Sequence, residues 1–133
     1  MAFELHHRLA ADCFLIGDFE LSSALLMNDS RFLWCILVPR REALRDLHDL
    51  AEFDRVALFD EIDVVSRAIT EINQADKINV AALGNQVPQL HVHVIARRVD
   101  DPAWPAPVWG SGTAVPYADG PAEAKQLQRA LKL

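Results

Sequence analysis

One run of alternating side chains near the middle of the chain limits how this protein can fold. From Gln89 to Ile95 the sequence reads Gln-Leu-His-Val-His-Val-Ile, and a loop with Gly84 precedes it. Successive side chains of a β-strand point to opposite faces. The run therefore predicts a strand over 90–96 with Gln89, His91 and His93 on one face. The Cα atoms of the two histidines would lie roughly 6.5–7 Å apart, so a rigid strand would present two neighbouring imidazoles.

The remaining elements alternate between strand and helix patterns in a way that predicts an α+β fold. Short apolar runs separated by turn residues indicate antiparallel strands at 13–19, 22–27 and 33–38, and a further strand at 78–83. Between them, apolar residues recur at steps of three and four from 49 to 75, which predicts a long amphipathic helix. Its expected buried stripe is Leu50, Phe53, Val56, Phe59, Ile62, Val65, Ile69 and Ile72.

The C-terminal third has a different character. Residues 100–116 contain four prolines, two tryptophans and two glycines, which predicts an extended, non-repetitive segment. Trp104 and Trp109 indicate that this segment packs over the body or a partner subunit. A short amphipathic helix is expected over 121–133. We interpret residues 1–133 as one domain, with a core at about 12–98 and an extension at 99–133.

Composition excludes several classes of function. The formal net charge of −6 argues against binding long nucleic acids, which requires clustered Lys and Arg. No apolar run approaches the roughly 20 residues of a membrane span, and no signal peptide is evident. Cys13 and Cys35 lack the spacing of a zinc ribbon or disulfide framework. We expect a cytoplasmic protein with a solvated N-terminus.

The histidine pair allows three interpretations from the residues alone. The pair can be the polar face of a half-exposed strand. It can supply two ligands to a metal, with His6, His7, His48 or an acidic residue as a third. The pair can also catalyse phosphoryl or nucleotidyl transfer. A neutral imidazole is a nucleophile near pH 7, and a second imidazole can bind a phosphate oxygen or assist the departure of a leaving group.

The segment from Leu83 to Ile95, LGNQVPQLHVHVI, resembles the signature of the histidine-triad (HIT) family. That signature is His-Φ-His-Φ-His-Φ-Φ, where Φ is apolar, after a glycine-containing loop. The resemblance extends upstream through Met27-Asn28, the apolar run 33–38 with Pro39, and the residues that open the long helix. It covers most of residues 12–98, including the order of the strands and the helix.

This resemblance implies an antiparallel sheet with the long helix on one face, a short C-terminal helix, and a homodimer. It implies that His91 is the nucleophile toward the α-phosphorus of a nucleotide conjugate and that His93 contacts phosphate or assists the leaving group. The implied substrate-binding residues are Asn28 at the ribose, Asn85 and Gln86 at the phosphates, Gln89 beside them, and Asn79, offset by one residue, as a further amide ligand. No metal or other cofactor is implied.

The chain departs from the family pattern at the first triad position, where Gln89 replaces histidine. Glutamine donates and accepts hydrogen bonds but does not change charge near neutral pH. The predicted function is hydrolysis or nucleotidyl transfer on a nucleoside phosphoramidate or a dinucleoside polyphosphate, through a nucleotidyl-histidine intermediate. The alternatives are a nucleotide-binding module with little catalysis and a metal protein with His91 and His93 as ligands.

Overall fold

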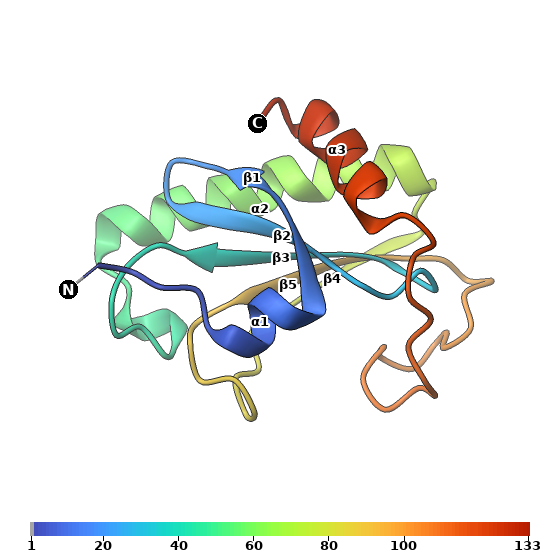
Figure 1. Cartoon of the computed structure of the whole chain (residues 1–133), viewed down its shortest axis with the longest axis horizontal. Coiled ribbons are helices and arrows are strands. Elements are labelled where there is room, and N and C mark those ends of the chain that lie inside the picture. Colours follow the sequence, from blue (N-terminus) through green and yellow to red (C-terminus); the bar gives the residue numbers. More distant parts are fainter. Residues whose placement is uncertain (1) are drawn as a thin grey trace.

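A computed structural model describes residues 2–133. Five strands form one antiparallel sheet in the order β1-β2-β3-β5-β4, which places β5 between β3 and β4 (Figure 1). The strands are β1 Cys13–Asp18, β2 Ser22–Met27, β3 Leu33–Pro39, β4 Lys77–Ala81 and β5 Val92–Arg97. The helices are α1 His7–Asp12, the 3-10 helix η1 Leu47–Asp49, α2 Glu52–Asn73 and α3 Gly120–Leu131. The predicted α+β fold with an antiparallel sheet is confirmed.

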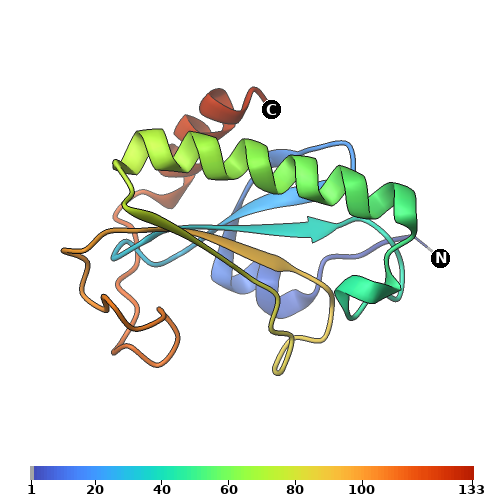
Figure 2. The same ribbon diagram turned by 180° about the vertical axis from the view of Figure 1, so that it is seen from behind.

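The two faces of the sheet are covered by different kinds of structure. The helices α2 and α3 lie on one face (Figures 1 and 2), where Val65, Ile69 and Leu127 belong to the same buried core as Val92 and Val94 of β5. On the opposite face lie α1, the loop between β4 and β5, and residues 100–116. Side chains from these segments and from the sheet form a second, smaller core there. The alternation in β5 thus separates a helix-covered face from a loop-covered face.

The helix α2 buries only part of the predicted stripe, including Val65 and Ile69. Its buried residues are Asp54, Leu58, Glu61, Val65 and Ile69, whereas Phe53, Val56, Phe59 and Ile72 are exposed. The carboxylate of Glu61 accepts hydrogen bonds from the backbone N–H groups of Leu21 and Ser22, at 2.8 and 3.1 Å. These two backbone N–H groups belong to the connection between β1 and β2 and need an acceptor. The helix α2 therefore places the polar side chain of Glu61 in its interface with the sheet.

The N-terminal residues are solvated only in part: His7 is exposed, as expected, whereas Phe3 and Leu5 pack against the second core. His6 caps α1 through its imidazole, which accepts a hydrogen bond from the backbone N–H of Arg8 at 3.1 Å. Leu9 of α1 is buried in the second core. The short helix escaped prediction because six residues are too few to show a periodic pattern.

The segment 100–116 packs over the body of the molecule, as predicted, without regular secondary structure. Its anchor is Asp101, whose carboxylate forms a bidentate pair with the guanidinium of Arg97 at 2.7 and 3.0 Å. Val108 and Trp109 contribute to the second core. Within residues 2–133, no helix combines the length and apolar character needed to cross a membrane.

Candidate active site

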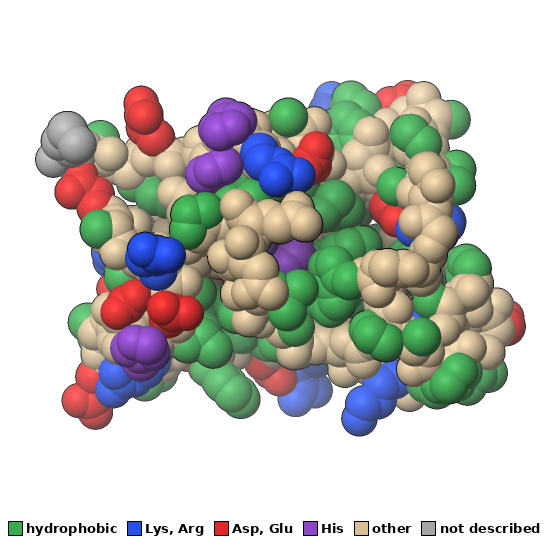
Figure 3. Space-filling model, turned by 90° about the horizontal axis from the view of Figure 1, so that it is seen from below, with side chains coloured by type: hydrophobic (Ala, Val, Ile, Leu, Met, Phe, Trp, Pro, Cys, Tyr) green, Lys and Arg blue, Asp and Glu red, His purple; other side chains and the backbone are tan. Residues whose placement is uncertain are grey.

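The two histidines lie on the loop-covered face of the central strand β5. His93 pairs with Ile36 of β3 and with Ala81 of β4, and His91 lies one residue before the strand begins. The side chains of both are nearly buried, with exposures of 7% for His91 and 4% for His93. Their ring centroids are 4.9 Å apart. Figure 3 shows this face, where histidine atoms are visible in a hollow near the centre of the molecule. The predicted side-by-side arrangement is confirmed.

The imidazole of His91 is oriented by the backbone. Its Nδ1 atom lies 2.7 Å from the carbonyl oxygen of Gln89. A carbonyl oxygen only accepts hydrogen bonds, so Nδ1 carries the proton of the neutral ring. The lone pair is then on Nε2. This tautomer is the one required of a nucleophile whose Nε2 attacks phosphorus.

The imidazole of His93 has the opposite tautomer. Trp34 of β3 donates its indole Nε1–H to Nδ1 of His93 at 3.0 Å, so the proton of neutral His93 is on Nε2. Trp109 packs edge-on against the same ring with centroids 4.9 Å apart. Burial, with a smaller contribution from His91, lowers the pKa of His93 to about 4. His93 is therefore a neutral hydrogen-bond donor at pH 7.

Three of the amide residues predicted to bind substrate, Asn28, Asn79 and Gln89, form hydrogen bonds to other parts of the chain. The side-chain oxygen of Asn28 accepts from the backbone N–H of Tyr117 at 2.9 Å. That of Asn79 accepts from the guanidinium of Arg97 at 2.9 Å. Asn79 sits two residues along β4 from Ala81, the partner of His93.

The side chain of Gln89 forms hydrogen bonds to the N-terminal segment. Its side-chain oxygen accepts from the backbone N–H of His6, and its side-chain nitrogen donates to the carbonyl oxygen of Glu4, both at 2.8 Å. The predicted contact between Gln89 and a phosphate would require its amide to leave these partners. In this structure Gln89 instead fastens the chain's first residues beside His91.

The loop between β4 and β5 borders a cavity that reaches His91. Gly84 turns this loop with a φ of 77°, in the left-handed region that favours glycine. Asn85 and Gln86, two of the predicted phosphate ligands, are exposed next to it. The cavity has a volume of about 240 Å³, and its lining includes Gly84, Gln89 and His91.

The opposite wall of this cavity was not predicted from the sequence. Residues 45–48, at η1, form that wall and include Arg45 and His48. More than 40 positions separate them from His91, so no local pattern linked the two segments.

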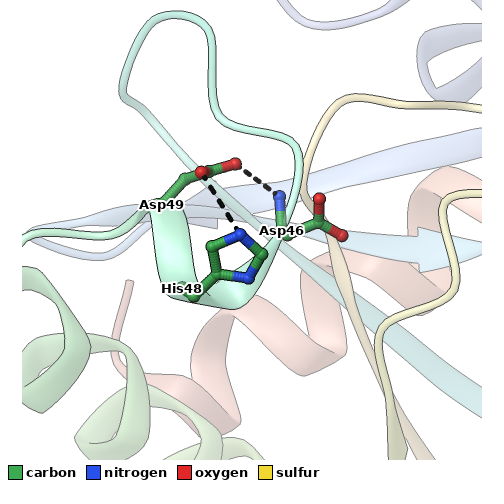
Figure 4. A group of neighbouring side chains, drawn as sticks. All are labelled: Asp46, His48 and Asp49. Carbon is green, nitrogen blue, oxygen red and sulfur yellow. Dashed lines mark hydrogen bonds and ion pairs between the residues drawn. The ribbon is translucent and has the colours of Figure 1, made fainter.

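A metal centre on His91 and His93 finds little support in the side-chain geometry. Among residues 2–133, the grouping of three or more metal-ligating side chains is Asp46, His48 and Asp49 at η1 (Figure 4). All three are exposed, and the carboxylate of Asp49 accepts hydrogen bonds from the backbone N–H groups of Arg45 and Asp46. This group does not include the paired histidines.

Comparisons with known proteins agree with this geometry. The HIT domain model matches residues 8–100, and the chain belongs to the HIT, or histidine triad, family. Histidine triad proteins from Bradyrhizobium japonicum and Marinobacter aquaeolei are 47% and 45% identical, with TM-scores of 0.92 and 0.94. The alignments cover 99% of this chain in both cases, and 97% and 98% of those chains.

A third structure, a histidine triad protein from Sinorhizobium meliloti, is 42% identical with a TM-score of 0.91, covering 98% of this chain and 95% of that one. A search of curated proteins finds no significant match. The family as a whole groups nucleotide-binding hydrolases and transferases.

Proposed function

We propose that this protein cleaves a nucleoside phosphate conjugate by nucleotidyl transfer through His91. The observation that carries the proposal is the pair of opposite tautomers on adjacent buried rings. The backbone of Gln89 leaves a lone pair on Nε2 of His91, while Trp34 leaves an N–H on Nε2 of His93. One ring is thus prepared to attack, and its neighbour is prepared to donate a hydrogen bond to a developing negative charge.

The reaction proceeds in two displacements. In the first, Nε2 of His91 bonds to the α-phosphorus as the bond to the leaving group breaks, giving a nucleotidyl-histidine. In the second, the oxygen of a water molecule bonds to the same phosphorus as the P–N bond breaks, the lone pair returns to Nε2 of His91, and the proton of the water passes to bulk solvent. The Nε2–H of His93 would stabilise the charged oxygens in both steps.

The surrounding loop would provide the remaining phosphate ligands. Asn85 and Gln86 are exposed next to Gly84, which lines the cavity that reaches His91, and their amide N–H groups would bind phosphate oxygens. Asn28 would contact the ribose through its amide nitrogen, since its oxygen is held by Tyr117. For Asn79 and Gln89, whose side chains bind Arg97 and the N-terminal segment, substrate contact remains a prediction.

The test is nucleotide release from adenosine phosphoramidate and, separately, from diadenosine tetraphosphate. We expect wild type to release AMP from at least one substrate and His91→Ala to lose about 10³-fold or more in rate. His7→Ala is the matched control, because His7 is exposed on α1, and it should retain full activity. Turnover by His91→Ala at the wild-type rate would refute the proposal.

Two other functions give different results in the same experiment. A nucleotide-binding module would bind AMP in calorimetry without releasing product from either substrate. A metal protein would carry stoichiometric zinc or iron that is lost in His91→Ala. The assigned tautomers favour nucleotidyl transfer over these two functions. They give His91 a lone pair on Nε2 for attack and give the adjacent His93 an Nε2–H group for hydrogen bonding.

We further propose that two copies associate through the free edge of the sheet. The strand β4 is the last in the sheet order, and the apolar surface beside it includes Phe59 and Val80, which are 72% and 48% exposed. Pairing β4 with its copy would cover both. In analytical ultracentrifugation, Val80→Lys should be monomeric where wild type is dimeric. Phe53→Glu, on another exposed part of α2, should leave the dimer intact.

A further inference from the structure

The buried contact between Trp34 and His93 carries a consequence for substrate choice. The indole Nε1 of Trp34 is a donor and has no acceptor capacity. It lies 3.0 Å from Nδ1 of His93, and both side chains are buried. If His93 placed a proton on Nδ1, two N–H groups would face each other and the indole would lose its partner. Both the other neutral tautomer and the imidazolium are disfavoured for this reason.

Within residues 2–133, the titratable group that acts electrostatically on His93 is His91, which also disfavours a positive charge there. The side chains in ring contact with it are His91 from its own strand segment, Trp34 from β3 and Trp109 from the segment 100–116. Its partner on β4 is Ala81. Neither tryptophan carries a charge, and a positive charge on His91 would repel one on His93. Burial among these groups keeps the pKa of His93 low, at about 4.

We propose that Trp34 is a positioning residue that holds His93 as a neutral imidazole with its proton on Nε2, and that the site therefore prefers substrates whose leaving group departs as a phosphate anion. Resting on the proposed function, this selects dinucleoside polyphosphates over nucleoside phosphoramidates. The neutral ring donates a hydrogen bond, but giving up its proton would produce an imidazolate anion. His93 then stabilises charge and does not act as a proton donor.

The two classes of leaving group differ in their need for a proton. When a bridging P–O bond breaks, the electron pair leaves on the terminal phosphate oxygen of a nucleoside polyphosphate. A phosphate has a second pKa of about 6, so that anion is stable at pH 7 without a proton. When a P–N bond breaks, the electron pair leaves on nitrogen, and without a proton the leaving group would be an amide anion. This anion is far more basic than a phosphate, so the nitrogen must gain a proton and depart as ammonia or an amine. A site without an acid assists only the first reaction.

The experiment compares Trp34→Phe with Trp109→Phe. Both variants remove an indole that touches the ring of His93, but the hydrogen bond to Nδ1 comes from Trp34. Two-bond ¹⁵N–¹H spectra of histidine-labelled protein report which ring nitrogen carries the proton. We expect the Nε2–H form in wild type and in Trp109→Phe, and a mixture of tautomers in Trp34→Phe.

The activity arm uses the ratio of kcat/KM for diadenosine tetraphosphate to that for adenosine phosphoramidate. Wild type should favour the polyphosphate by about 10²-fold, the lower end of what a proton donor contributes. In Trp34→Phe this ratio should fall by roughly tenfold or more, because His93 gains access to its protonated form. The additional binding energy of the second adenosine cancels when ratios are compared between variants.

Three results would overturn the proposal. The first is an Nδ1–H tautomer of His93 in wild type, and the second is an unchanged tautomer and ratio in Trp34→Phe. The third is a wild-type preference for the phosphoramidate, which holds even if Trp34→Phe fails to fold. If wild type cleaves neither substrate, the proposed function fails together with the substrate preference, while the spectra still decide the role of Trp34.

Discussion

Replacing Asp101 with alanine should cost about 3–5 kcal/mol of unfolding free energy. The carboxylate of Asp101 pairs with Arg97, and the two side chains are 7% and 2% exposed. Removing it would leave a buried guanidinium without its counter-ion, and breaking such a pair typically costs this amount. The same carboxylate also accepts from the backbone N–H groups of Arg98, Ala103 and Trp104. Arg97 would keep its hydrogen bonds to Asn79 and to the carbonyl oxygen of Ala106. Because these two bonds remain, the loss of unfolding free energy should not exceed this range.

Urea denaturation at pH 7, followed by circular dichroism, measures this loss. For a chain of 133 residues it corresponds to a decrease in Tm of roughly 10–20 °C. Asp100→Ala is the matched control, because Asp100 pairs with Arg98 at the exposed surface and such pairs contribute about 0–1 kcal/mol. If the two variants differ by less than about 1 kcal/mol, the buried pair does not anchor the segment 100–116 as we argue.

Other predictions concern pH, the N-terminal contact and a close-packed glycine. Since the pKa of folded His93 is about 4 and that of unfolded histidine about 6.5, the unfolded state binds more protons between these values, so stability falls as pH drops from about 6.5 to 4. In urea titrations, the decrease in unfolding free energy between about pH 6.5 and 4 should be smaller by about 3 kcal/mol in His93→Gln than in wild type. If the two proteins lose the same unfolding free energy over this range, the low pKa of His93 is contradicted. Gln89→Ala should accelerate hydrogen exchange at the amide of His6 by tenfold or more, roughly the effect of about 1.4 kcal/mol; unchanged exchange would exclude an anchoring role. Gly120→Ala should destabilise by about 1–3 kcal/mol, because the new Cβ would overlap the ring of Phe14, and thermal melts at the wild-type Tm would show that the ring moves aside freely.

The strand that carries the histidines was predictable because the relevant pattern is local. Alternation over a few residues assigns each side chain to a face regardless of the rest of the fold, and it placed His91 and His93 together correctly. The acidic partners of Arg97 and Arg98 are equally close in sequence, and both ion pairs form. In each pair the two residues lie within four positions of one another, so the turn after β5 is enough to bring them together.

The buried stripe of α2 was predicted only in part, because apolar residues occupy much of the circumference of the helix. Period alone then cannot select the stripe that faces the sheet. The deciding contacts come from distant residues: Arg41 pairs with Asp54, and Glu61 binds the backbone at Leu21. Gln89 illustrates the same limit at the site, because its partners lie at the other end of the chain.

The contact between Gln89 and the first residues has a consequence for the order of folding. The hydrogen bond from His6 to Gln89 joins residues 83 positions apart, and closing a loop of that length from an open chain costs about 4 kcal/mol in entropy plus a constant. Each of the two hydrogen bonds between Gln89 and this segment contributes only about 1 kcal/mol. The N-terminal residues therefore dock after the sheet has already brought residue 89 near them. The surroundings of His91 are therefore completed late in folding, after the sheet that carries this histidine has formed.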